Sequence, residues 1–429
     1  MPAQTAGWAV VRVLPSPHSF CPGNATHVHE MNEPLSISPL RSLSRAATSR
    51  IAADVDGVEV WFEADDLPLR ASPEAFTSAF LIPAAALERR LTVCDPVAAD
   101  FTTALPRILD IVAGWWGYSK LLPSLDNPAV TPPQNAAGQP GTTARRGTAL
   151  CFSGGVDSFY SLLALGRHID AIVFVHGFDI KIDDVARATV VEQHLRAVAA
   201  AVGVQPVVVR TNLRAHPAFR TTDWNHTHGG ALAAIGHLLA DEWNTLLVSA
   251  AYPLDNPEPC GSHRELDSLW SGAGLTVEHV GAERDRTGKL AVLKDDPLVQ
   301  RYLRVCWENR SDRLNCSRCE KCIRNEVVLQ ALGALDSFAV FEPAATLATR
   351  VDGVPAIRNA ALFRRYNSAL AMGLPRDTAR AVRRLLARSR RARVRRRIAD
   401  ARWYAAAVAR RIARLAARET SATVIAGER

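Results

Sequence analysis

The chain has no long apolar run, little lysine, and no excess of glycine or proline. No apolar stretch reaches the roughly 20 residues that span a bilayer, so we expect no membrane helix and no membrane partner. The 25 glycines and 25 prolines among 429 residues are too few for a fibrous or collagen-like chain. Hydrophobic residues make up 48% of the chain and charged residues 22%, which excludes a wholly disordered protein. At roughly 150 residues per domain, the length predicts two to three domains.

The N-terminal sequence MPAQTAGWAVVRVLPS lacks the basic segment and the uninterrupted apolar stretch of a secretory signal. We therefore expect a cytoplasmic protein. In that reducing compartment, clustered cysteines indicate metal binding or catalysis more often than disulfides. The sequence does not indicate the oligomeric state.

The net charge of +8 is unevenly distributed. Residues 376–429 contain 17 Arg, no Lys and four acidic residues, so this segment carries +13 and the rest of the chain −5. A sparse apolar stripe at helical spacing predicts a helical, Arg-rich region over 346–429; it consists of Val394, Ile398, Val408, Ile412 and Leu415. The arginines could contact the phosphates of tRNA, or the helix could be solvated and pack on the body or on a partner. Only Trp403 and Tyr404 could stack on bases, so an aromatic platform is not evident.

The first third of the chain predicts three segments. Residues 1–45 have no sustained period, and we expect a poorly ordered lead. Residues 46–122 predict a small α+β domain, because Asp56-Gly57 separates two β-rich runs in the manner of a hairpin and helical periodicity follows. Residues 123–147 hold five prolines and no apolar period, which is typical of a linker.

Residues 148–345 predict the central domain. Apolar strands alternate there with amphipathic helices; the strands are 148–152, 171–178, 205–212 and 245–252, and the helices between them include 185–203 and 229–242. This alternation is typical of an α/β fold with a doubly wound, Rossmann-like parallel sheet. Ligands bind such sheets at the carboxyl ends of the strands.

The segment Cys151-Phe-Ser-Gly-Gly-Val-Asp-Ser158 joins a predicted strand to a predicted helix. Its two glycines allow a tight turn with outward-facing N–H groups, and the helix N-terminus adds positive potential for an anion. Ser153 and Ser158 can donate hydroxyl hydrogen bonds, and Asp157 could hold Mg²⁺ near a phosphate. The segment lacks the lysine and the spacing of the GxxxxGK[ST] loop. It predicts a phosphate-binding loop of another type.

All six positions from Ser153 to Ser158 match the SGGxDS signature, so the segment resembles the PP-loop ATP pyrophosphatases. That group includes GMP synthetase, asparagine synthetase, tRNA-thiolating enzymes and 7-cyano-7-deazaguanine synthase. The resemblance covers roughly residues 148–335 and implies an adenine nucleotide alpha-hydrolase-like fold that cleaves ATP between its α and β phosphates. It also implies adenine near 174–178. The nucleotide-binding residues it implies are Ser153, Gly154, Gly155, Val156, Asp157 and Ser158.

Four of the eight cysteines fall within 17 positions, and they are Cys306, Cys316, Cys319 and Cys322. Two overlapping CxxC pairs and a preceding cysteine supply the four thiolates of a closed tetrahedral Zn²⁺ site. Free thiols, an iron–sulfur cluster or a redox disulfide are the other interpretations. The pattern is similar to the C-terminal zinc site of 7-cyano-7-deazaguanine synthase, Cys followed by Cys-Gly-x-Cys-x-x-Cys, with Ser317 in place of the glycine.

The remaining cysteines, Cys21, Cys94, Cys151 and Cys260, are isolated in the sequence. Cys151 fits core packing on the strand before the loop. Cys260 precedes Gly-Ser-His in a loop where substrate could bind, and it is the one cysteine suited to a nucleophilic role.

Further polar residues follow the predicted strands. Arg286 and Lys289 could neutralise pyrophosphate or could be solvated surface charges, and we place Lys289 with Ser153, Asp157 and Ser158 as the predicted catalytic group. Other polar residues could face the cleft, or could cap a helix or lie on the surface. They are His176, Asp179, His226, Thr227 and His228.

The leading functional hypothesis is an ATP-dependent ligase-like enzyme. It would adenylate a carboxylate or amide-type oxygen of an acceptor, after which a nitrogen nucleophile such as ammonia displaces AMP. Mg²⁺ would bridge the phosphates and zinc would be structural. The alternatives are sulfur insertion into tRNA or a small molecule, with Cys260 as the catalytic cysteine, and a non-catalytic nucleotide-binding module that assembles partners. The sequence does not identify the acceptor, which could be small or macromolecular.

Overall fold

The computed structural model describes residues 9–10, 33–125, 146–255, 257–357 and 359–399. The chain divides into two compact units, Met1–Leu314 and Asn315–Arg429. Within the described ranges, no helix combines the length and the hydropathy needed to cross a membrane.

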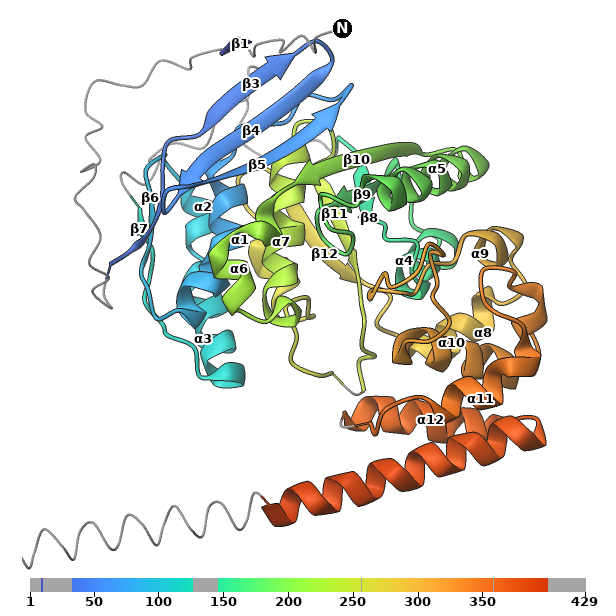
Figure 1. Cartoon of the computed structure of the whole chain (residues 1–429). Helices are drawn as coiled ribbons and strands as arrows, with labels where there is room; N and C mark the ends of the chain where they lie inside the picture. The colour runs from blue at the N-terminus through green and yellow to red at the C-terminus, as the bar shows by residue number, and fades with distance from the viewer. Residues whose placement is uncertain (1–8, 11–32, 126–145, 256, 358, 400–429) are drawn as a thin grey trace, which may run out of the picture. The chain divides into compact units, whose positions relative to one another are not determined.

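One large sheet runs through the first unit (Figure 1). β8 (Thr148–Cys151) pairs in parallel with β9 (Ala171–His176) on one side and β11 (Thr245–Ser249) on the other. β10 (Gln205–Thr211) extends the parallel part beyond β9, and β12 (Thr276–Val280) extends it beyond β11. The strand order therefore reverses between β8 and β11, where open α/β sheets bind ligands. The α/β class, with a mostly parallel central sheet compatible with a Rossmann-like fold, is confirmed.

The sequence of the central strands explains their place. All six residues of β9, Ala-Ile-Val-Phe-Val-His, are buried. A strand covered on both faces needs apolar residues at every position, and β-branched side chains pack well on a pleated surface. α5 (Val185–Val202) ends at Gly203, whose φ of 74° is the left-handed conformation that terminates a helix.

The sheet continues with antiparallel strands from the N-terminal third. β10 pairs with β5 (Val58–Asp65), and β5 pairs with β4 (Thr48–Val55) through a two-residue turn. Asp56 and Gly57 in that turn have φ of 51° and 77°, as a type I′ hairpin requires, so the predicted hairpin is confirmed. The remaining strands are short: β1 (Ala9–Val10), β2 (Leu35–Ile37), β3 (Arg41–Arg45), β6 (Leu91–Val93) and β7 (Ser124–Leu125).

This continuity differs from the expected organisation. Residues 46–122 share one sheet with the residues after 148 instead of forming a sheet of their own, and β2 and β3 lie inside the expected lead 1–45. Strands of three to five residues carry too few positions for a period-2 pattern, which is why the sequence did not indicate them. The other predicted boundaries stay predictions.

The helices of the first unit include two that pack closely. α1 (Pro73–Ala86) and α7 (Trp224–Leu239) lie side by side in Figure 1. The first unit also contains α2 (Ala99–Thr102), α3 (Leu105–Trp116), α4 (Val156–Leu163), α6 (Pro217–Thr221), α8 (Arg286–Leu293) and α9 (Pro297–Tyr302).

The described part of the second unit contains helices joined by loops. They are α10 (Glu320–Ala331), α11 (Leu347–Asp352), α12 (Ala360–Met372) and a helix over 376–399. The last helix buries Val382 and Leu385 near its start, whereas Val394 and Ile398 are 57% and 48% exposed. The predicted stripe residues Val408, Ile412 and Leu415 lie outside the described residues, as do Trp403 and Tyr404.

Gly230 on α7 gives a test of this packing. A Cβ at Gly230 would lie 2.2 Å from the carbonyl oxygen of Ser78 on α1, which is backbone and cannot rotate away. We expect Gly230→Ala to lower the free energy of unfolding by about 1–3 kcal/mol, because it overpacks the contact. Denaturant unfolding of the full chain measures this.

The matched control is Gly114→Ala in α3, where the added Cβ meets nothing within 4 Å. That change should stabilise the protein by about 0.5–1 kcal/mol, because alanine restricts the unfolded chain. Equal stability of Gly230→Ala and the unmodified protein would contradict the close α1–α7 contact.

Candidate nucleotide-binding site and metal centre

The predicted strand–loop–helix is present: β8 ends at Cys151 and α4 begins at Val156. Gly154 has a φ of 74°, the left-handed region that favours glycine, and Gly155 is the N-cap of α4 without a side-chain cap. The loop is also held from outside. The backbone N–H of Arg304 donates to the carbonyl of Gly154 at 2.8 Å, and its guanidinium donates to the carbonyl of Ser153 at 3.4 Å. The glycines therefore shape the turn, and the segment after α9 fixes it in place.

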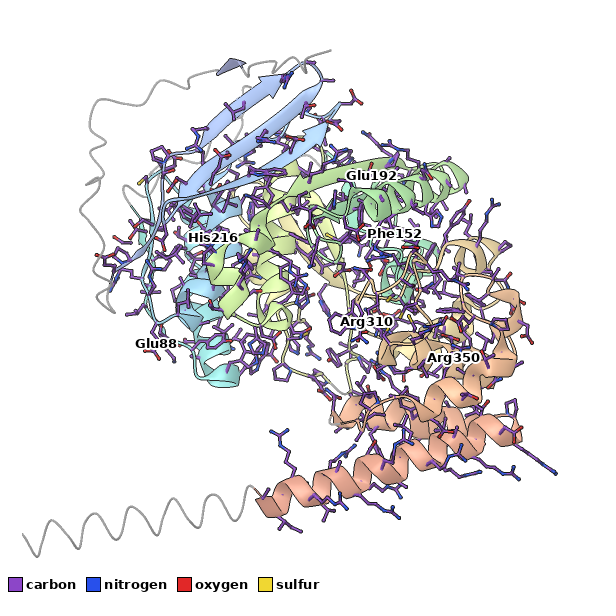
Figure 2. All side chains as sticks on the ribbon, viewed as in Figure 1. Glu88, Phe152, Glu192, His216, Arg310 and Arg350 are labelled. Atoms are coloured by element: carbon purple, nitrogen blue, oxygen red, sulfur yellow. The ribbon has the colours of Figure 1, made fainter. Side chains whose placement is uncertain are left out.

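A cavity of about 190 Å³ opens at the carboxyl ends of β8, β9 and β11. Its lining combines an aromatic and aliphatic wall with a few polar groups; it includes Phe152, Val173, Phe174, Phe178, Trp224, Leu232 and Val248, and the polar Ser153, Ser158, Asp179, His228, Ser249 and Ser262. Figure 2 labels Phe152, the residue directly after β8, and Glu192 on α5. An apolar pocket with few polar groups is the usual form of a small-molecule site.

Several predicted residues meet in this cavity. Ser153 and Ser158 of the loop line it together with Asp179 and with Phe174 and Phe178 from the expected adenine region. The Ser158 hydroxyl also donates to the carbonyl of Gly155 at 3.1 Å. The loop and the end of the second strand therefore face one space, as the carboxyl-end rule predicts.

The structure separates the three neighbours His226, Thr227 and His228. His228 lines the cavity, and its Nδ1–H donates to the carbonyl of Trp224 at 3.1 Å. Burial lowers its pKa, so the ring is neutral near pH 7 and Nε2 can accept a hydrogen bond. His226 instead stacks on Trp116 with ring centroids 3.9 Å apart, and Thr227 is buried in α7.

His176 also has a local role, because its Nε2 donates to the carbonyl of Lys181 at 2.9 Å. In contrast, Trp224 and Ser262 line the cavity although the sequence analysis did not single them out. Trp224 directly follows the N-cap Asp223 of α7. The guanidinium carbon of Arg214 lies over its ring, 4.4 Å from the ring centroid. In the sequence, the one signal that could have pointed to Trp224 as a cavity residue was its position, an aromatic residue at the start of a helix near the carboxyl end of a strand.

Asp157 lies in a charged cluster beside the loop. Its carboxylate accepts hydrogen bonds from Arg286 and, at 3.1 Å, from Lys289, which also donates to the carbonyl of Ala250 at 2.6 Å. Lys289 is 1% exposed and Asp157 16%. The structure thus brings together Asp157 and Lys289 of the predicted catalytic group, as an ion pair with Arg286.

The cluster sets the charge states of its members. Burial alone would raise the pKa of Asp157, but the charges and hydrogen bonds of Arg286 and Lys289 outweigh it and hold that pKa well below its ordinary value. Burial lowers the pKa of Lys289, and the neighbouring Asp157 offsets part of this effect. The cluster is therefore ionised at neutral pH and carries a net positive charge next to the first turn of α4.

Two cysteines near the cavity are protonated. Burial raises the pKa of Cys151 and that of Cys260 to about 12. The thiol of Cys260 donates to the carbonyl of Ser262 at 2.7 Å. Cys94, which lies apart from the other cysteines in the sequence, is disulfide-bonded.

The four clustered cysteines form a candidate metal centre, as predicted. The Sγ atoms of Cys306, Cys316, Cys319 and Cys322 all lie within 4.8 Å of one another, and all four residues are buried. The backbone N–H of Cys319 donates to Sγ of Cys316 at 3.2 Å, and that of Cys322 donates to Sγ of Cys319 at 3.4 Å. Four converging thiols with such donors could hold a metal ion such as zinc, and they leave no open coordination position.

Ser317 stands where the similar zinc sites have glycine. Its φ is 51°, so this position does adopt the left-handed conformation that favours glycine. The buried serine is held there by two hydrogen bonds: its hydroxyl accepts from the N–H of Glu342 at 2.9 Å, and its carbonyl accepts from Arg350 at 2.9 Å. These bonds explain how the loop keeps its shape without glycine.

Comparisons with protein-family models, curated proteins and solved structures found no match for this chain.

The metal centre predicts a specific metal content. We expect about one zinc per chain in the purified protein, and we expect Cys319→Ser to lose most of it, because the closed site needs all four ligands. Elemental analysis by mass spectrometry measures both. Cys260→Ser, a buried cysteine outside the cluster, is the matched control and should keep its zinc. Iron with visible absorbance would favour the iron–sulfur interpretation instead.

The Asp157 cluster predicts a pH-dependent contribution to stability. Asp157→Asn leaves the buried Lys289 and the 15% exposed Arg286 without their anion, so the free energy of unfolding should fall by about 3–5 kcal/mol at pH 7. Because the folded-state pKa lies below the ordinary value of 3.8, the loss should be constant above that value and shrink as the pH falls below it. Denaturant unfolding at several pH values measures this.

Asp295→Asn is the control for that series. Its carboxylate also pairs with a lysine, Lys294 at 2.6 Å, but it is 80% exposed, so the change should cost at most about 1 kcal/mol. A loss for Asp157→Asn no larger than for Asp295→Asn would show that the cluster does not stabilise the fold.

Proposed function

We propose that this chain is an ATP-dependent adenylating enzyme of the PP-loop type, with an adenine nucleotide alpha-hydrolase-like core. ATP is its substrate, and the products are AMP, pyrophosphate and an amide or related C–N compound. The observation that carries the proposal is the cavity at the β8–β11 switch point, whose wall includes Ser153 and Ser158 of the SGGVDS loop.

The chemistry of the cavity suits an adenine nucleotide. Phe174, Phe178 and Trp224 offer flat apolar surface to a purine, and the neutral His228 offers an acceptor nitrogen to an exocyclic amine. At the other end, the uncapped start of α4 and the hydroxyls of Ser153 and Ser158 suit a phosphate.

The charged cluster supports the same assignment. Arg286 and Lys289 bring positive charge to the first turn of α4, where negative charge develops on the departing pyrophosphate. Asp157 fixes the position of both cations. An acceptor oxygen attacks the α-phosphorus, the bond to the β-phosphate oxygen breaks, and pyrophosphate leaves with its electron pair.

The expected Mg²⁺ ligand does not fit this arrangement. Each carboxylate oxygen of Asp157 already accepts a hydrogen bond from a cation, and the positive charges of Arg286 and Lys289 disfavour Mg²⁺ beside them. We derive no step through a metal held there; Mg²⁺ would accompany ATP as its counter-ion. The zinc centre, with four thiolates, would be structural.

Nitrogen is favoured over sulfur as the nucleophile. Sulfur insertion through Cys260 needs a thiolate. Burial raises the pKa of that thiol to about 12, and the thiol donates a hydrogen bond to the carbonyl of Ser262. The exposed arginines of the helix over 376–399 keep tRNA among the acceptors to be tested.

The experiment follows α-labelled ATP with Mg²⁺, ammonium chloride and fractions of a cell extract, namely small molecules, tRNA and protein. We expect AMP and pyrophosphate in equal amounts, dependent on one fraction. Ser153→Ala should lower kcat/KM by about 10–100-fold, because it removes one hydrogen bond to a charged group. Ser153 is exposed, so the change should not disturb folding.

Ser268→Ala, another exposed serine, lies outside the cavity lining and should leave the rate unchanged. Release of ADP and phosphate in place of AMP would contradict the proposal. ATP binding by calorimetry with no AMP from any fraction would identify a non-catalytic nucleotide-binding module.

A further inference from the structure

A second polar cluster surrounds Asp267, the first residue of a short 3-10 helix, Asp267–Trp270. Asp267 is 1% exposed. Its carboxylate accepts from the hydroxyl of Ser262 at 2.8 Å, from the backbone N–H of His263 at 3.2 Å and from Nδ1–H of His279 at 2.7 Å. A buried carboxylate with three donors is ordered, and it orders the groups that bind it.

His279 is the third donor to Asp267. It lies on β12, and its side chain is 10% exposed. Because Nδ1–H donates to Asp267, Nε2 is the ring nitrogen that remains for a ligand. In this arrangement a carboxylate fixes the tautomer and the orientation of a histidine ring.

His279 lines a second, small cavity of about 10 Å³, together with Tyr252, Leu254, Ser262 and Ala282. That volume holds about one water-sized molecule. Ser262 also lines the larger cavity of about 190 Å³ that contains the loop serines. The small cavity is therefore next to the space in which the acceptor would be activated.

We propose that the small cavity is the subsite for ammonia and that His279 is its base, with Asp267 as the positioning residue. The inference rests on the proposed function, because it places the second substrate of that reaction in the small cavity. Ammonia has the size of water and can donate a hydrogen bond to Nε2 of His279, and the ammonium ion can give that nitrogen a proton. Ammonia also fits where a sulfur carrier or an amino acid would not.

Ammonium gives one proton to Nε2 of His279, and the freed lone pair of ammonia forms a C–N bond to the activated carbon of the acceptor. The C–O bond to AMP then breaks, and AMP leaves with that electron pair. The nitrogen loses its surplus proton to solvent, and His279 later releases its own.

The test observes the histidine directly, without ATP or acceptor. The full chain, labelled with ¹⁵N-histidine, is titrated with ammonium chloride at constant ionic strength, and the imidazole nitrogens are followed by NMR. We expect a saturable change in the Nε2 shift of one histidine, which His279→Gln removes from the spectrum. Methylammonium chloride should give no such change, because its methyl group exceeds the cavity.

Ala282→Val is the second variant, since Ala282 lines the cavity without touching the Asp267–His279 hydrogen bond. It should abolish the response to ammonium while the His279 signal persists, and it carries the test if His279→Gln does not fold. No response to ammonium in the unmodified chain, or an equal response to methylammonium, would overturn the proposal. Failure of ATP cleavage would leave this readout intact, so the two proposals fail separately.

Discussion

The candidate site depends on the parallel pairing of β8 between β9 and β11. Leu150 pairs with Ile172 on one side and with Leu247 on the other, so the three strands end at the same edge. Backbone groups buried in a sheet have to be paired, and a parallel ladder needs a long crossover for each strand. Those crossovers bring the SGGVDS loop, the end of β9 and the start of α7 to one cavity.

The Asp157 cluster adds charge to that geometry. A carboxylate in the first turn of α4 binds two cations of α8, so the loop carries positive potential without a lysine of its own. Removal of one member is expected to destabilise the fold, because the buried Lys289 depends on Asp157 for its counter-charge. The aspartate of the SGGVDS segment thus holds two cations beside the loop.

The cysteines and the histidines near the two cavities differ in whether they can accept a hydrogen bond from a ligand. Burial raises the pKa of the thiols of Cys151 and Cys260, whereas His228 and His279 each donate from Nδ1 and have Nε2 as an acceptor of a hydrogen bond. The proposed attack of a nitrogen nucleophile would use such an acceptor. The four-cysteine centre would stand apart from that chemistry, since four thiolates around a metal ion would offer no open position to a substrate.

The sequence by itself determined what depends on neighbours along the chain. The Asp56-Gly57 hairpin, the strand–loop–helix around Gly154 and the spacing of the cysteine cluster follow from backbone φ and from contacts a few residues apart. Only the tertiary structure decided the partners of Asp157 and Asp267, and which of the adjacent histidines faces the cavity. Asp157 meets Arg286 across 129 positions, and such pairs are set by how the crossovers pack on the sheet, which no local pattern records.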